Sequence, residues 1–307
     1  MILTVCLSPC IDVTIELDAL NVGKVNVLKS KALSFTGKAL NVAIGVSRLG
    51  GSPYATGFMY NENANEFEQA LDREGVPFTF VWNNGRVREN YKFIDSKSML
   101  TEINGVSEPI EPYKLDELAH MVNRISQHAS VTVISGSLPV GVPAEYYGTL
   151  FRMLNPNTKK IVDAEGAKMF AALNVGVDLV KPNIEELEAC LGRELKTQEE
   201  MIDGCRELIS RGARMVLLSL GREGAILTDG VKSYFCKSMN VAVNSAVGAG
   251  DAMIAAVAMQ MEQNADMPTI LRAGVAAGTA SVTTFDTISF RREKYDEIYH
   301  NLVVTEL

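Results

Sequence analysis

Gly248, Ala249, Gly250 and Asp251 are the residues whose types and spacing point most directly to chemistry. They precede the apolar run 252–261, which has the length and composition of a buried helix. The first turn of such a helix offers unpaired backbone N–H groups and the positive end of the helix dipole, and both attract anions. The stretch therefore predicts a phosphate site beside a general base. A glycine turn in which Asp251 only caps a core helix has the same pattern.

The other polar or glycine-containing loops follow predicted strands. They are residues 8–12, 135–139, 163, 181–183 and 219–221. Ligands of an open α/β sheet bind outside the carboxyl ends of its strands, so these loops are expected to share one rim with Asp251. A Walker-type phosphate loop is excluded, because Gly37 and Lys38 have no glycine five residues before them and no Ser or Thr after them.

The elements that must position these residues alternate along the chain. Strands are predicted near 1–7, 54–58, 78–81, 130–135, 159–163, 177–180 and 214–219, with a hairpin at 225–236. Helices are predicted near 38–49, 62–74, 112–127, 143–154, 166–174, 183–191 and 197–211, with three more after residue 249. This alternation predicts an α/β fold with a doubly wound, mostly parallel sheet flanked by helices.

Two half-exposed β segments interrupt that alternation and predict a small β lid built from residues 12–35 and 86–106. No linker or repeat divides the chain, so a single domain over residues 1–307 is expected. Short β segments with open edges are unstable alone in water. We therefore expect the two segments to pair with each other.

Composition limits the partners. The chain has 307 residues, is 47% hydrophobic and carries a formal charge of −8. It contains no basic block, so neither a nucleic-acid nor a membrane partner is expected. It also lacks a basic leader segment and any apolar run of ~20 residues, which predicts a cytoplasmic protein. The five cysteines show no metal-binding spacing and are expected to be reduced thiols, and His120, His128 and His300 are assigned no chemistry.

Five ordered motifs resemble those of the ribokinase-like sugar kinases, in particular the phosphofructokinase B branch that contains 1-phosphofructokinases and tagatose-6-phosphate kinases. The motifs are residues 37–43, 135–139, 181–186, 219–224 and 244–251. The resemblance extends over nearly the whole chain and implies a ribokinase-like fold. It also implies ATP-dependent phosphoryl transfer to a sugar, for which the protein supplies positioning and charge neutralisation.

The resemblance implies roles on the nucleotide side of the site. The amides of residues 248–251 would hold the transferring phosphate, and Asp251 would deprotonate the acceptor hydroxyl. Asn183 and Glu186 would contact the cofactor, with Glu186 acting on Mg²⁺ through water. Ser219, Gly221 and Gly224 would line the nucleotide. A helix cap with a solvated glutamate, and the start of an ordinary hairpin, remain the alternatives at these two motifs.

It also implies a sugar site. The residues expected there are Asp12, Gly37, Lys38, Asn41, Arg88, Lys92 and Ser137. Strand alternation places Arg88, Asn90 and Lys92 on one face, where the two cations, together with Lys38, would bind a sugar phosphate. A solvated edge strand guarded by charges is the alternative. Asp12 in its loop would accept sugar hydroxyls, and Asn41 would add a donor and an acceptor.

The expected activity is an ATP- and Mg²⁺-dependent kinase of a ketohexose monophosphate, with fructose 1-phosphate first and tagatose 6-phosphate second. Free sugars or nucleosides come third. Thr36, Ala39 and Ser8 depart from the usual motifs, and Ala246 replaces a frequent threonine, so a non-catalytic nucleotide or sugar-phosphate sensor is the rival from another class. The family further implies a homodimer formed through the β lid.

Overall fold

The computed structural model describes residues 1–97, 99–284 and 290–307. Residue 98 of the predicted lid and residues 285–289 of the predicted domain lie outside the described residues. The largest element is a ten-stranded sheet in the order β14-β13-β12-β11-β10-β9-β8-β1-β4-β5. Its parallel strands are β1 (Ile2–Cys6), β4 (Pro53–Tyr60), β5 (Phe78–Asn83), β8 (Val131–Ser135), β9 (Lys159–Asp163), β10 (Val177–Val180) and β11 (Ala213–Ser219). The antiparallel strands are β12 (Ala225–Thr228), β13 (Ser233–Cys236) and β14 (Val304–Glu306).

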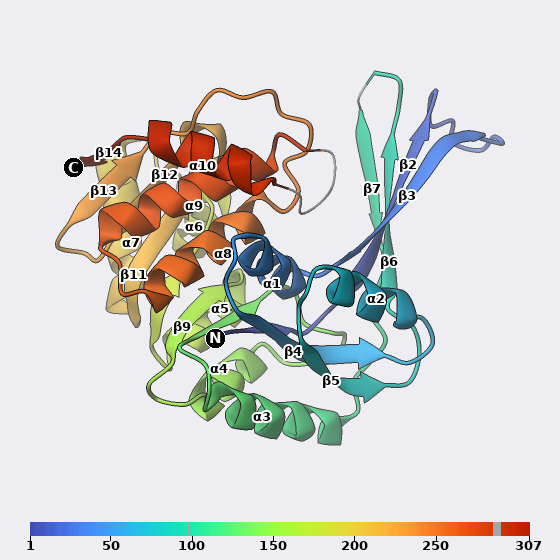
Figure 1. Ribbon diagram of the computed structural model, residues 1–307, viewed down its shortest axis with the longest axis horizontal. Helices are drawn as coiled ribbons and strands as arrows, with labels where there is room; N and C mark the ends of the chain where they lie inside the picture. Colours follow the sequence, from blue (N-terminus) through green and yellow to red (C-terminus); the bar gives the residue numbers. More distant parts are fainter. Residues whose placement is uncertain (98, 285–289) are drawn as a thin grey trace.

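This sheet confirms the predicted mostly parallel α/β fold (Figure 1). The sequence pattern did not predict β14, because a strand of 3 residues is too short to show an alternation. β14 pairs with β13 and so extends the predicted hairpin at the edge of the sheet.

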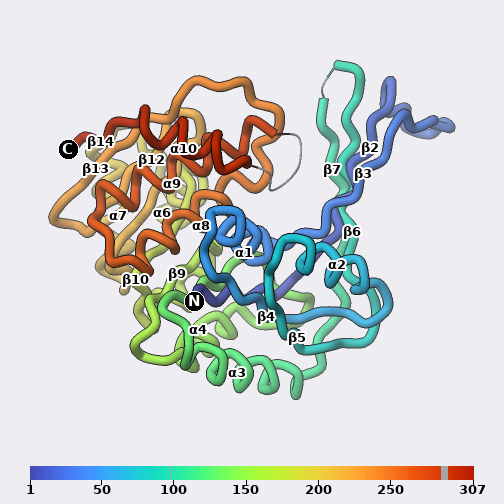
Figure 2. Tube along the Cα trace, in the orientation of Figure 1, coloured from blue at the N-terminus to red at the C-terminus, as the bar shows by residue number. Residues whose placement is uncertain are grey.

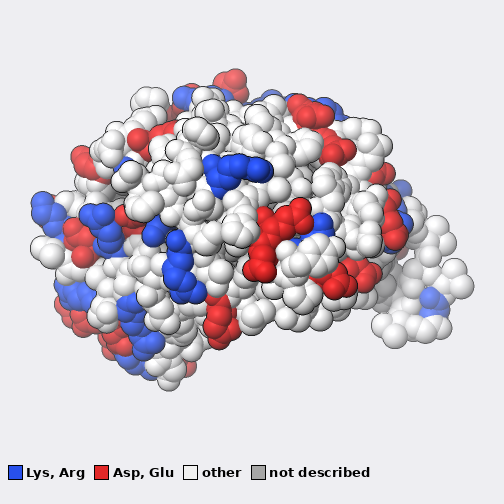
Figure 3. Space-filling model, turned by 90° about the horizontal axis from the view of Figure 1, so that it is seen from below, with Lys and Arg blue, Asp and Glu red and all other residues white. Residues whose placement is uncertain are grey.

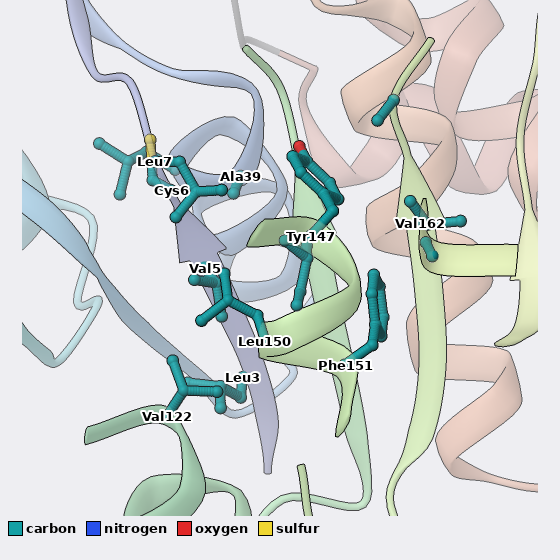
Figure 4. Packing of buried hydrophobic residues seen from close by; sticks show 14 of the residues in the cluster. Leu3, Val5, Cys6, Leu7, Ala39, Val122, Tyr147, Leu150, Phe151 and Val162 are labelled. Carbon is teal, nitrogen blue, oxygen red and sulfur yellow. The ribbon is translucent and has the colours of Figure 1, made fainter. Parts of the chain in front are cut away.

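Helices cover both faces of the sheet. They are α1 (Lys38–Arg48), α2 (Asn65–Arg73), α3 (Pro112–Ser126), α4 (Glu145–Met153), α5 (Gly166–Leu173), α6 (Ile184–Leu191), α7 (Gln198–Ser210), α8 (Ala249–Glu262), α9 (Met267–Ser281) and α10 (Arg292–Asn301). Successive residues of β1 point to opposite faces: Ile2 packs in one apolar cluster with α8 and α9, whereas Leu3 and Val5 pack in the other with α3 and α4. Figure 4 shows Leu150 of α4 beside Val5 of β1, and Phe151 on the side of Val162.

A separate four-stranded sheet has the order β3-β2-β6-β7. Its strands are β2 (Cys10–Leu17), β3 (Leu28–Thr36), β6 (Arg88–Ile94) and β7 (Leu100–Asn104). Strands β2 and β6 pair in parallel, so the two predicted lid segments lie side by side, and their hairpins project away from the helices (Figures 1 and 2). The assignment of residues 1–307 to one domain with a lid stays a prediction.

The prediction that Asp12 lies in a loop is wrong. Asp12 lies inside β2, where it pairs with Ser34 of β3 and Asn90 of β6. Only residues 7–9 separate β1 from this second strand, in which β2 gains ladder partners on both sides.

Other sequence-based expectations concern cysteines, histidines and charge. The five cysteines are free thiols. His120 lies in α3 and His300 in α10, but His128 lies beyond the end of α3. Lys and Arg are interspersed with Asp and Glu on the face seen in Figure 3. Within the described ranges, no helix has both the length and the apolar character needed to span a membrane.

Candidate active site

A cavity of about 1020 Å³ opens between the carboxyl ends of the parallel strands and the four-stranded sheet. Every residue to which the sequence assigned a role lines this cavity. These residues are Asp12, Gly37, Lys38, Asn41, Arg88, Lys92, Ser137, Asn183, Glu186, Ser219, Gly221, Gly224, Gly248, Ala249, Gly250 and Asp251. The loops expected to share one rim therefore do so.

Helix α8 begins at this cavity. Its N-cap is Gly248, whose φ of 82° lies in the left-handed region that favours glycine. No side chain caps the helix, so the interpretation of Asp251 as a helix cap is wrong. The Asp251 carboxylate instead accepts a hydrogen bond of 2.6 Å from Nδ2 of Asn41 in α1. The amides of the first turn and the carboxylate thus face the same cavity.

The surroundings of Asp251 make it a stronger base than an ordinary aspartate. Burial and the negative charge of Asp163 raise the pKa of Asp251 to about 7, although Lys38, Asn41 and Lys181 act in the opposite direction. Such a carboxylate is about half ionised at neutral pH, which suits a general base. Oδ1 of Asn41 is buried and has no hydrogen-bond partner among the described residues. Asn41 therefore offers a ligand this Oδ1 acceptor, while one N–H of its amide group binds Asp251.

A second buried carboxylate, Asp163 at the end of β9, was placed on the rim by the sequence but assigned no role. Its Oδ1 lies 3.2 Å from Nζ of Lys181, and its Oδ2 lies 3.5 Å from Nζ of Lys38. Oγ of Ser135 donates to Oδ2 at 3.2 Å. Burial alone would raise the pKa of Asp163, but the two ammonium groups hold it below its ordinary value. The Asp163 carboxylate in turn raises the pKa of Lys38.

Arg88 and Lys92 point into the cavity from β6 but differ in their partners. Nζ of Lys92 forms a buried ion pair of 2.7 Å with Asp12, which also accepts a hydrogen bond from Asn90. Arg88 donates to Oγ of Ser8 at 3.2 Å and to Oδ1 of Asn90 at 2.8 Å. No described carboxylate forms an ion pair with Arg88, so its positive charge is available to an anionic ligand.

Asn183 and Glu186 form a reciprocal cap at the start of α6. Oδ1 of Asn183 accepts from the Glu186 amide at 2.7 Å, and Oε2 of Glu186 accepts from the Asn183 amide at 3.0 Å. The helix-cap alternative is therefore correct for Asn183, whereas Glu186 completes the cap instead of being only a solvated side chain. No group of three or more His, Cys, Asp or Glu that could hold a metal is found in the described part of the chain. This donor set fits Mg²⁺ only where water and substrate supply most of its ligands.

The loop from Ser219 to Gly224 contains a short 3₁₀ turn, Gly221–Glu223, and leads into the hairpin of β12 and β13. A side chain at Gly224 would place Cβ only 2.0 Å from the carbonyl oxygen of Cys236 in β13. The hairpin alternative thus explains why residue 224 is glycine. The loop nevertheless lines the same cavity as Asp251.

The chain is similar to known kinases over its whole length. Residues 5–294 match the pfkB family of carbohydrate kinases. A 1-phosphofructokinase of Vibrio cholerae is 28% identical over 100% of this chain and 97% of the relative. A tagatose-6-phosphate kinase of Staphylococcus epidermidis is 28% identical over 100% of both chains. The crystal structure of phosphofructokinase-2 from Escherichia coli in complex with fructose-6-phosphate has a TM-score of 0.89 at 27% identity and covers 97% of this chain and 98% of that one. Because the family match spans almost the whole chain, the chain belongs to the pfkB family of carbohydrate kinases.

Proposed function

We propose that the protein transfers the γ-phosphoryl group of ATP to a hydroxyl of a ketohexose monophosphate, with fructose 1-phosphate as the first candidate and tagatose 6-phosphate as the second. That it is a sugar-phosphate kinase follows from its family and from the relatives named above. The proposal adds the acceptor, the nucleotide, Mg²⁺ and the roles of individual residues.

The observation that carries the proposal is that one cavity is lined by a cation for the acceptor, a base and a loop for the nucleotide. Arg88 lines the cavity from β6, and Asp251 lines it from the start of α8. The loop after Ser219, at the end of β11, also lines it. A sugar phosphate held by Arg88 and a nucleotide held beside that loop would both reach Asp251. Phosphoryl transfer requires this arrangement, because the acceptor oxygen and the leaving oxygen must be in line with the transferred phosphorus.

In the proposed reaction, the hydrogen bond from Asn41 holds the Asp251 carboxylate, which takes the proton of the acceptor hydroxyl. Oδ1 of Asn41 accepts a hydrogen bond from another hydroxyl of the sugar, which satisfies this buried atom. The first amides of α8 stabilise the charge on the transferred group. Glu186 would hold Mg²⁺ through water beside the nucleotide, and the ion would supply further charge neutralisation.

Arg88 supports a phosphorylated acceptor. A guanidinium without a carboxylate partner at a ligand cavity is suited to bidentate binding of phosphate. Lys92 does not add a second free cation, because Asp12 neutralises it. We therefore assign the phosphate to Arg88, and sugar hydroxyls to the remaining lone pairs of Asp12.

A panel of acceptors tests the proposal. Fructose 1-phosphate, tagatose 6-phosphate, fructose 6-phosphate, free hexoses and nucleosides are compared by kcat/KM in a coupled assay of ADP release with Mg²⁺. We expect a ketohexose monophosphate to give the highest value. Far better turnover of a free sugar or a nucleoside would contradict the assignment of Arg88.

A sensor without turnover is the second candidate function. Two observations favour it: Thr36 and Ala39 replace glycines common in the family motif, and the Asp12 carboxylate is already paired with Lys92. A sensor would bind ATP and sugar phosphate in a calorimeter but release no ADP across the panel. Turnover of one acceptor at ordinary kinase rates would exclude this candidate.

We further propose a homodimer formed through the four-stranded sheet. The strand registers place Leu33, Val13, Tyr91 and Ile103 side by side across the sheet. Leu33, Tyr91 and Ile103 are exposed, at 49%, 37% and 58%. The opposite face carries Asp12, Asn90 and Lys92 and lines the cavity. An apolar face of this kind on an open sheet is stabilised when a second copy covers it.

A further inference from the structure

Asp163 occupies a central place among the charges of the rim. It lies at the carboxyl end of β9, flanked by Ser135 at the end of β8 and by Lys181 just after β10. Only 1% of its surface is exposed. Its two oxygens face two ammonium groups, one from the loop after β10 and one from α1. The sequence-based assignments and the proposed reaction leave this carboxylate without a function.

The two ammonium groups lie where the transferred phosphate is expected. A Cβ atom built on Gly250 would stand 3.3 Å from Nζ of Lys181, so this ammonium is adjacent to the first turn of α8. Lys38 opens α1, the helix whose Asn41 holds Asp251. Without Asp163, Lys181 would lose its ion-pair partner, although its side chain is only 6% exposed.

We propose that Asp163 is a positioning residue of the kinase reaction, which fixes the ammonium groups of Lys38 and Lys181 beside the α8 N-terminus and keeps a negative charge near Asp251. This inference rests on the proposed function of Asp251 as the base. One carboxylate between two ammonium groups leaves one net positive charge for phosphate. The negative charge of Asp163 also strengthens Asp251 as a proton acceptor.

The chemical step balances with these groups. The acceptor oxygen forms a bond to the γ-phosphorus, and its proton passes to Asp251. The bond between the γ-phosphorus and the bridging oxygen breaks, and its electron pair leaves with ADP. Asp251 becomes neutral in this step and no longer opposes the net positive charge of the group formed by Asp163, Lys38 and Lys181. That charge stabilises the phosphate in the transition state.

The test is the pH dependence of kcat/KM in Asp163→Asn. Asp251 is faced by Asp163 from β9, by Lys38 and Asn41 from α1 and by Lys181 from the loop after β10. Removing the carboxylate frees both ammonium groups to attract the charge of Asp251, so the pKa of Asp251 falls. The acid limb of the profile should move to lower pH by about one unit. The plateau should fall by about tenfold or more, because the base is weaker and the lysines are no longer held.

Matched variants separate this role from a structural one. Asp178→Asn removes a carboxylate of β10 that pairs with the exposed Arg214, and it should keep the wild-type limb. If Asp163→Asn does not fold, Asp163→Asn/Lys181→Met removes both members of the buried pair. Its limb should also move to lower pH, since Asp163 affects Asp251 more than Lys181 does.

Each outcome decides a different question. An unchanged acid limb in a folded Asp163 variant overturns the inference and leaves the proposed function intact. Full turnover in Asp251→Asn overturns both, because Asp251 is then not the base. A shifted limb in Asp163→Asn, with wild-type behaviour in Asp178→Asn, supports the positioning role.

Discussion

The rim of the ten-stranded sheet and the four-stranded sheet differ in which side chains they bury and which they expose. At the rim, Asp163, Lys181 and Asp251 are almost completely buried, and their charges act on one another. The four-stranded sheet buries polar groups only on the face toward the cavity and exposes apolar side chains such as Ile103 on the other face. A change at the rim should therefore alter chemistry and stability together, whereas a change on the outer face of the small sheet should alter association.

The rim also contains two carboxylates with opposite pKa shifts. Burial affects both, but two ammonium groups hold the pKa of Asp163 low, whereas burial and Asp163 raise the pKa of Asp251 to about 7. This difference shows that the partners of a buried carboxylate decide whether it stays ionised or can accept a proton near neutral pH.

The largest expected effect is on turnover in Asp251→Asn. The amide keeps the size of the side chain but cannot accept the hydroxyl proton, so kcat should fall by about 10²- to 10⁴-fold. ATP affinity, measured by calorimetry, should stay within a few fold because the α8 amides remain. Since Asp251 does not cap α8, no loss of helix stability should accompany the change. Wild-type kcat in the folded variant would falsify the proposed mechanism.

The same substitution should stabilise the protein at high pH. The folded pKa of Asp251, about 7, lies above its value in the unfolded chain. The folded protein therefore loses stability as pH rises from the unfolded pKa to the folded pKa, because the buried carboxyl must then ionise. The amide removes this cost, which is at most about 4 kcal/mol at pH 8. Urea unfolding at pH 5 and pH 8 should show a larger gain at pH 8. Equal gains at both pH values would contradict the assigned titration.

Arg88→Ala should weaken sugar-phosphate binding with little effect on the nucleotide. Loss of a charged hydrogen-bond donor costs about 1.5–3 kcal/mol, so KM for the sugar phosphate should rise by roughly 10- to 100-fold. The matched control is Arg86→Ala, because Arg86 is exposed and only reaches Glu62 at 3.7 Å. If both variants raise KM equally, Arg88 is not the phosphate ligand.

The smallest effect is expected on the outer face of the four-stranded sheet. In Ile103→Asp, a charge enters the proposed apolar interface. The dissociation constant of the dimer, measured by analytical ultracentrifugation, should increase by about tenfold. Val231→Asp changes a still more exposed apolar residue, in the turn between β12 and β13, and should leave association unchanged. A wild-type protein that is monomeric at micromolar concentration would refute the interface itself.

The sequence by itself determined the alternation of strands and helices, the rim on which the polar loops meet, and the glycine-rich start of α8 at Asp251. These features follow from local patterns, because strand periodicity and helix starts are written in neighbouring residues. Periodicity also placed Arg88, Asn90 and Lys92 on one face of β6. The motifs then identified the family.

Only the tertiary structure decided how these groups share their charges. Asn41 and Asp251 are 210 residues apart, and their hydrogen bond depends on how α1 and α8 pack on the sheet. The pairing of Lys92 with Asp12 follows from the strand register, and the two ammonium partners of Asp163 come from different layers. A carboxylate, a lysine or an amide looks the same in a sequence wherever it lies, because its charge state and free hydrogen-bonding atoms are set by burial and by partners that folding brings from distant parts of the chain.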